Sequence, residues 1–96
     1  MGQTGDVFRP QGRLTMASAA PVLAEGRARA RAGDLRVDLS VLTEADSAAL
    51  ALLFDWMRCA RSHGHRLAVT GLPASLASLA ELYGVRELVP TDEGRV

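Results

Sequence analysis

The feature that most constrains this chain is the alternation of short strand-like segments with longer helix-like segments. The clearest helix is expected over residues 47–62, where Leu50, Leu53, Phe54 and Met57 follow the i, i+3, i+4, i+7 spacing of one apolar helix face. The other expected helices are residues 16–32 and 73–83, and the expected strands are residues 7–15, 35–39, 66–71 and 85–89. Helices that alternate with short strands predict an α/β fold in which the helices pack on a sheet.

The length of the chain and its proline and glycine residues add two expectations. Pro10 and Gly12 interrupt residues 7–15, so this strand is expected at an edge of the sheet. The whole chain, residues 1–96, is long enough for one domain. We expect its two ends, 1–6 and 91–96, to be flexible.

The charge balance excludes broad classes of partner. The chain carries 11 basic and 11 acidic residues, so its formal net charge is zero. A neutral balance gives no general attraction to nucleic acid or to an anionic membrane. The sequence also has no basic-then-apolar leader, and its longest apolar run is far too short to span a bilayer. We therefore expect a cytoplasmic protein that binds no nucleic acid and does not insert into a membrane.

The residues that carry chemistry in enzymes form no recognisable set in this sequence. Cys59 is the only cysteine, so there is no intrachain disulfide and no two-cysteine metal site. His63 and His65 have no pair of cysteines and no acidic ligand nearby, and we expect a solvated helix end there. No phosphate-cradling glycine loop and no supportable Ser–His–Asp spacing occurs. The sequence therefore predicts a binding module that is not an enzyme and holds no metal or cofactor.

The strongest candidate site lies in the stretch TEADSAALALLF, residues 43–54. Asp46 and Ser47 stand where the first N–H groups of the following helix need acceptors, so we expect the pair to cap that helix. The same place is the positive end of the helix, which favours a phosphate on Ser47, and it follows a strand end. Such a phosphate would add negative charge beside Asp38, Glu44 and Asp46. The residues alone leave two interpretations open, a cap only or a cap that is also a site.

The apolar face of the same helix is wider than one buried stripe requires. Leu52, Trp56 and Cys59 extend it beyond the roughly 100° that faces a core. Two explanations remain open: a neighbouring helix covers the extra width, or Leu52 and Trp56 form an apolar docking surface, for which Trp is a common residue. The wide face is also compatible with a homodimer.

Three stretches of the chain resemble the STAS domain family. VDLSVLTEADSAALALLFDW resembles the central signature, in which a D-L-S strand end leads to D-[S/T]-x-G-L at a helix start. RLAVTGLPASLASLAELYGVRELVP resembles the second half of the small single-domain STAS proteins of the MlaB type, and QGRLT resembles the entry to their first helix. The resemblance covers roughly residues 7–90. It implies a STAS fold, a four- to five-stranded mixed sheet flanked by about three or four helices.

The resemblance to MlaB-type proteins also implies a function. It suggests a cytoplasmic accessory subunit that docks on the ATPase of a phospholipid-transporting ABC system, and so sits peripherally at the inner membrane. By position, Asp46 and Ser47 match the family's Asp and Ser/Thr at the tip of the second helix. With Asp38, Ala48 and Ala49 they are the expected partner contacts.

The resemblance implies an alternative as well, an anti-sigma-factor antagonist in which a partner kinase phosphorylates Ser47. Two features favour the MlaB type over this alternative. The L-Y-G-V element at residues 82–85 resembles MlaB-type proteins. Ala49 stands where the family usually has Gly, and a methyl group there would narrow the approach of a partner's backbone.

Overall fold

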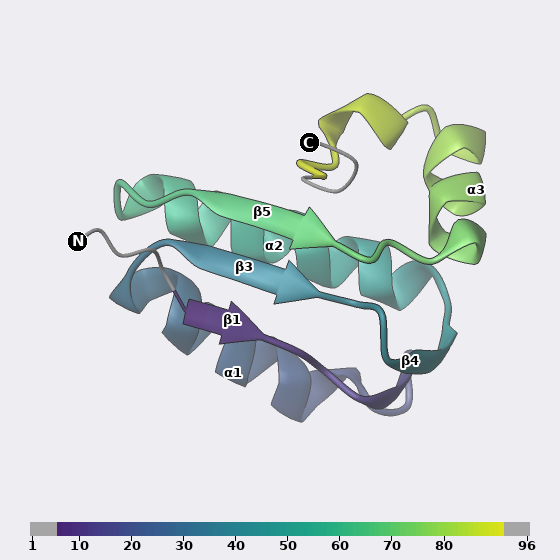
Figure 1. Cartoon of the computed structure of the whole chain (residues 1–96), viewed down its shortest axis with the longest axis horizontal. Coiled ribbons are helices and arrows are strands. Elements are labelled where there is room, and N and C mark those ends of the chain that lie inside the picture. The colour runs from purple at the N-terminus through teal and green to yellow at the C-terminus, as the bar shows by residue number, and fades with distance from the viewer. Residues whose placement is uncertain (1–5, 92–96) are drawn as a thin grey trace.

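The computed structural model describes residues 6–91, and Figure 1 shows how their helices and strands are arranged. Along the chain the elements are β1 (Asp6–Phe8), β2 (Gly12–Leu14), α1 (Ala19–Ala32), β3 (Leu35–Asp38), β4 (Leu42–Ala45), α2 (Ser47–Ser62), β5 (Leu67–Thr70), α3 (Ala74–Leu82) and the 3₁₀ helix η1 (Arg86–Leu88). This order confirms the predicted α/β fold. Of the two ends expected to be flexible, residues 1–5 and 92–96 lie outside the described residues.

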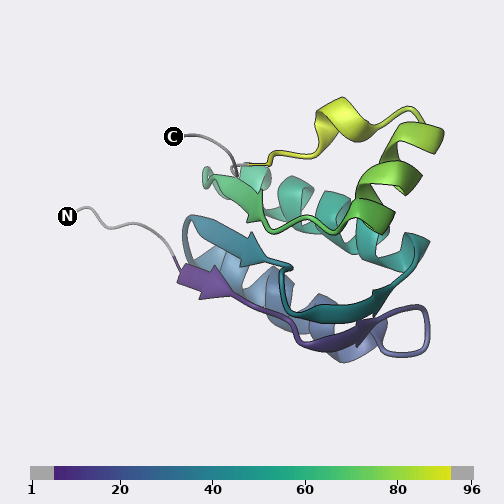
Figure 2. The ribbon, with the colours of Figure 1, turned by 45° about the vertical axis from the view of Figure 1, so that its right-hand side comes forward.

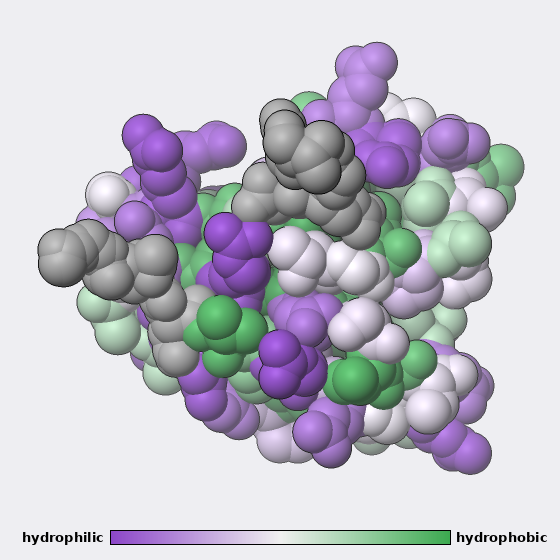
Figure 3. Space-filling model, in the orientation of Figure 1, coloured by the Kyte–Doolittle hydropathy of each residue, from purple (hydrophilic) through white to green (hydrophobic). Residues whose placement is uncertain are grey.

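Three strands form the main sheet in the order β1-β3-β5, and neighbouring strands run parallel. Parallel strands need long crossovers, and α1 and α2 supply them. Leu35 and Val37 of β3 are buried, whereas Arg36 between them is exposed. In Figure 1, α1 and α2 lie behind the sheet, so the buried side chains face these two helices. The opposite face is turned toward the viewer in Figure 3, where hydrophilic and hydrophobic side chains are intermixed.

A second parallel pair, β2 with β4, lies beside the main sheet (Figure 2). The described strands thus form two parallel sheets, whereas a single mixed sheet was expected. Residues 7–15 divide into β1 and β2 around Pro10, which has no N–H to donate to a neighbouring strand. As predicted, β1 lies at an edge of its sheet. The sequence did not predict β4, because its LTEA sequence lacks the alternation of apolar and polar residues that indicates a strand. In the structure both Thr43 and Glu44 are exposed.

Helices α1 and α2 pack against each other around Trp56, whose side chain is fully buried. Its ring meets that of Phe8 from β1 edge-on, with centroids 5.7 Å apart and 64° between the planes. Its Nε1 donates a hydrogen bond to the carbonyl oxygen of Leu23 in α1 at 3.1 Å. Gly26 of α1 lies directly against the ring, so the absence of a side chain there permits the close approach. The other large and fully buried side chains are Leu14, Leu39, Leu53, Leu76, Val37 and Val69.

The C-terminal part of the fold differs from its prediction. The sequence predicts a strand over residues 85–89, but η1 occupies most of this stretch. Val89 is buried and Leu88 is exposed, and Val85, four residues before Val89, packs against the core, which is the spacing of a helical turn. After η1 the chain returns to the sheet, where Thr91 forms a parallel bridge with Val69 of β5.

The two residues at the limits of the described chain were both expected in flexible ends, and both are paired. Asp6 pairs with Leu35 in the main sheet. Thr91 is held beside β5 because the N–H of Val69 donates to the carbonyl oxygen of Pro90 at 2.9 Å. Within residues 6–91, no helix is long and apolar enough to cross a membrane.

Candidate functional site

The N-terminal end of α2 is held by Asp46, which follows β4 directly. Its backbone is extended, with φ −129° and ψ −165°, and this geometry turns the chain from the strand into the helix. Asp46 Oδ1 accepts a hydrogen bond from the N–H of Ala48 at 2.8 Å, and the N–H of Asp46 donates to the carbonyl oxygen of Leu14 in β2 at 3.4 Å. The predicted cap is therefore confirmed for Asp46, whereas Ser47 is the first residue of α2.

The residues that follow the cap differ in their access to solvent. Ser47 is exposed and Ala48 is half-buried, so both can meet a partner. Ala49 has no exposed surface and belongs to the core. The expectation that Ala49 is a partner contact whose methyl group narrows a partner's approach is therefore wrong, because that methyl group packs inside the protein.

Asp46 also binds a second segment that sequence reasoning did not connect with it. Its Oδ2 accepts a hydrogen bond from the N–H of Met16, which lies in the loop between β2 and α1, at 3.3 Å. The Met16 side chain is 78% exposed. The two residues are thirty positions apart, and no motif spacing indicates their contact. One carboxylate thus joins the start of α2 to the β2–α1 loop.

Asp38 belongs to a different hydrogen-bonding group. Its Oδ1 accepts from the N–H of Ser40 at 2.9 Å, and its Oδ2 accepts from Arg9 Nε at 2.8 Å. The hydrogen bond from Ser40 and then the Arg9 guanidinium lower the pKa of Asp38 from its ordinary value of 3.8 to about 2. Gly71 packs closely on this turn, with φ +66°, and a Cβ there would lie 2.8 Å from that of Ser40. The structure therefore gives Asp38 the contacts of a turn residue, separate from those of Asp46.

Leu52 and Trp56 do not form a docking surface. Leu52 is 5% exposed and Trp56 has no exposed surface. The expectation of an exposed apolar face is wrong, because α1 covers this side of α2 and Gly26 lets the indole ring fit between the helices. The other explanation considered from the sequence, a covering helix, is the one that the structure shows.

Several other titratable residues make structural contacts. Arg27 binds Asp55 through two hydrogen bonds of 2.7 and 2.9 Å, which tie α1 to α2. His63 and His65 contact the carbonyl oxygens of Cys59 and Ala30 through Nδ1, each at 3.0 Å. No group of three or more His, Cys, Asp or Glu side chains that could hold a metal ion occurs within residues 6–91.

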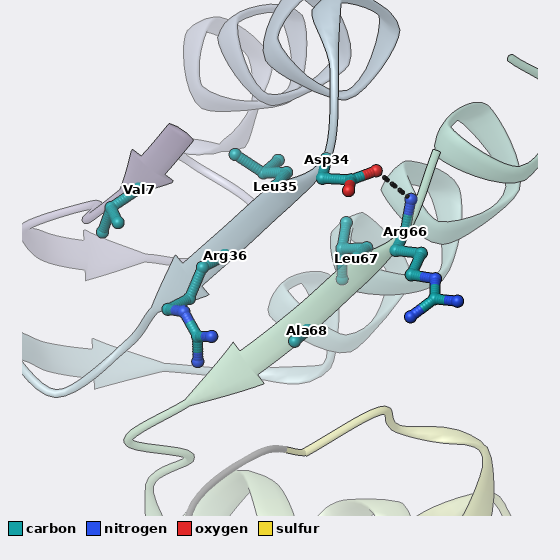
Figure 4. A pocket seen from close by; sticks show the side chains of 7 residues that line it. All are labelled: Val7, Asp34, Leu35, Arg36, Arg66, Leu67 and Ala68. Atoms are coloured by element: carbon teal, nitrogen blue, oxygen red, sulfur yellow. Dashed lines mark hydrogen bonds between the residues drawn. The ribbon is translucent and has the colours of Figure 1, made fainter. Parts of the chain in front are cut away.

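A shallow cavity of about 360 Å³ lies where β3 and β5 begin. Figure 4 shows the side chains that line it, with the N–H of Arg66 bound to Asp34 Oδ1 at 2.8 Å. In Figure 1 this is the end of the sheet away from the start of α2. None of the expected partner contacts lines this cavity; its lining residues are Val7, Asp34, Leu35, Arg36, Arg66, Leu67 and Ala68.

Comparison with known proteins gives one family and one fold. A family model described as "Mlab, STAS domain" matches residues 4–90. No curated protein sequence matches the chain. Among solved structures, the chain is similar to one described as "Structure of the Anti-Sigma Factor Antagonist SpoIIAA in its Unphosphorylated Form", with a TM-score of 0.71. The two share 14% sequence identity over 92% of this chain and 79% of that chain, which confirms the fold expected from the sequence.

Proposed function

The chain belongs to the MlaB-type STAS domain family, and we propose that it is an accessory subunit that docks on the ATPase of a phospholipid-transporting ABC system. STAS domains are generally non-catalytic modules, and those of this family bind protein partners. In the proposed role the protein hydrolyses nothing itself and stabilises or tunes its ATPase partner. It then works in the cytoplasm, at the inner membrane surface, through its place in the ABC complex.

The observation that carries the proposal is the exposed Ser47 on a fixed helix start. The hydrogen bonds of Asp46 to Ala48 and Leu14 hold this end of α2 in place before any partner arrives. A surface that is already ordered loses little conformational entropy on binding, which favours its use as a contact. Ser47 and Ala48 are small, so a partner's backbone can approach them closely.

The test is the substitution Ser47→Asp, measured as binding to the purified ATPase subunit of the host's phospholipid-transport system. We expect the dissociation constant to rise at least about tenfold, roughly 1.4 kcal/mol, because the added carboxylate is bulkier than the hydroxyl and brings a charge into the contact. The variant should stay folded, since an acidic residue in the first turn of a helix is stabilising. Circular dichroism checks that point.

Ser78→Asp is the matched control, because Ser78 is an exposed serine of α3 outside the α2 start. It should bind as the wild type does. If Ser47→Asp binds the ATPase with unchanged affinity, then the start of α2 is not the contact and the proposal fails.

A second candidate function is an anti-sigma-factor antagonist that is controlled by phosphorylation of Ser47. It is favoured by the exposed position of Ser47 at the positive end of α2, where a phosphate is stabilised. Affinity purification of the tagged protein from its native host separates the two candidates. Recovery of an ABC ATPase and its permease supports the first, whereas a serine kinase together with phosphate on Ser47 supports the second.

A further inference from the structure

The loop between β2 and α1 presents Met16 to solvent from an ordered turn. The N–H of Ser18 donates to the carbonyl oxygen of Thr15 at 3.0 Å, and the N–H of Thr15 donates to Ser18 Oγ at 3.0 Å. The Ser18 hydroxyl in turn donates to the carbonyl oxygen of Arg13 at 2.9 Å. At 78%, Met16 is the most exposed of the large hydrophobic side chains in the described part of the chain. A single exposed apolar residue is ordinary, but here its backbone is fixed on both sides.

The turn is also attached to the candidate site. Asp46 Oδ2 accepts from the N–H of Met16 at 3.3 Å, while Oδ1 of the same carboxylate caps α2 through Ala48 at 2.8 Å. Figure 2 shows the loop after β2 and the end of β4, which leads into α2, on the same side of the molecule. The backbone of Met16 is therefore bonded to the residue that precedes Ser47, and this bond joins the β2–α1 loop to the start of α2.

We infer that Met16 is an apolar anchor of the ATPase contact and that Asp46 is the positioning residue that holds it beside Ser47. This inference rests on the proposed function, because Met16 is assigned to the ATPase only through its connection with the Ser47 site. The ATPase then offers an apolar pocket, since a thioether side chain gains affinity only where it leaves water. A flexible, unbranched methionine fits such a pocket without exact shape matching. Anchors of this kind carry most of the energy in many protein interfaces.

The test replaces the side chain and keeps the backbone bond to Asp46. Met16→Gln has similar length and retains the N–H, so the turn and the cap stay intact while the apolar end is lost. We expect its dissociation constant for the purified ATPase subunit to rise about tenfold or more. Met16→Leu, which stays apolar, should bind within about threefold of the wild type. Leu82→Gln is the matched control, because Leu82 is 75% exposed on α3, and it should leave the affinity unchanged.

Amide hydrogen exchange tests the positioning role of Asp46 separately. In Asp46→Asn the amide offers one acceptor where the carboxylate offers two, so it cannot keep both bonds. We expect exchange of the Met16 or Ala48 N–H to become at least tenfold faster, while the side-chain variant Met16→Gln leaves both rates as in the wild type. If both amides of Asp46→Asn exchange as slowly as in the wild type, Asp46 does not position Met16.

The outcomes distinguish this inference from the function on which it rests. If the wild type does not bind the ATPase, or if Ser47→Asp binds as well as the wild type, the proposed function fails. If Ser47→Asp weakens binding and Met16→Gln does not, the function stands and the Met16 inference is overturned. It is also overturned if Met16→Gln only converts a dimer of this chain to a monomer, which light scattering would detect.

Discussion

The contact between Gly26 and Trp56 predicts that Gly26→Ala destabilises the protein, whereas the same change usually stabilises a helix. Gly26 lies inside α1, where a change from Gly to Ala ordinarily stabilises a helix by about 1 kcal/mol. Here a Cβ would overlap three atoms of the indole ring, Cε2, Cζ2 and Nε1. Trp56 has no exposed surface, and its Nε1 is bound to Leu23 O, so the ring has no free space into which to move.

The expected magnitude follows from these two opposing effects. Overpacking a core costs typically 1–3 kcal/mol, and the overlap with three ring atoms places Gly26→Ala near the upper end, about 3 kcal/mol. After the gain in helix propensity, the free energy of unfolding should fall by about 2 kcal/mol. For a chain of this size that lowers the Tm by roughly 8–16 °C.

Urea unfolding followed by fluorescence measures this change directly, because Trp56 is the only tryptophan and sits at the contact itself. Gly33→Ala is the control, since Gly33 has an extended backbone, with φ 172°, and no atom lies within 4 Å of the added Cβ. It should stay within about 0.5 kcal/mol of the wild type. If Gly26→Ala proved as stable as the wild type or more stable, the close packing of α1 on α2 around Trp56 would be refuted.

Two further predictions concern the carboxylates. The pKa of Asp38 is lowered to about 2 in the folded protein, so its contribution to stability is complete above the unfolded value of 3.8 and is lost as the pH falls toward 2. In Asp38→Asn the free energy of unfolding should be lower than that of the wild type at pH 7, and it should vary less between pH 4 and pH 2. Urea titrations at several pH values measure both effects. If the free energy of unfolding of the variant falls as steeply with pH as that of the wild type, Asp38 is not the source of the pH dependence. Asp46→Ala removes both the α2 cap and the bond to Met16, and should lower the free energy of unfolding at pH 7 by about 1–2 kcal/mol. A loss below about 0.3 kcal/mol in thermal or urea unfolding would contradict the capping role.

The parts of the fold that the sequence predicts well are those set by local signals. Helix α2 has the bounds predicted for it, because one apolar period runs through residues 47–62 and Asp46 is a strong capping residue. Residues 85–89, VRELV, were expected to form a strand, but the charged residues Arg86 and Glu87 are adjacent, and the residues that turn inward are Val85 and Val89, which are four apart. There the three-dimensional path back to β5 decides the conformation.

Only the part of the candidate site that lies within one segment of the chain could be predicted from the sequence. Asp46 and Ser47 are recognisable from their position before an apolar helix. The contact of Asp46 with Met16 joins residues in separate segments, and it depends on the pairing of β2 with β4, which the sequence does not indicate. The burial of Trp56 likewise depends on Gly26 in another helix, so helical periodicity within α2 alone leaves it unresolved.

The parallel register of the main sheet has a consequence for the synthesis of the chain. Asp6 pairs with Leu35 and Leu35 with Leu67, so each new strand partner arrives about thirty residues after the previous one. At roughly 5–20 residues per second, β3 waits on the order of two to six seconds before β5 has been translated. Throughout that interval one edge of β3 has no strand beside it, and an open edge is a template for pairing with another chain. The nascent protein is therefore most exposed to aggregation after β3 and before β5 has been translated, when its central strand is complete and its sheet is not.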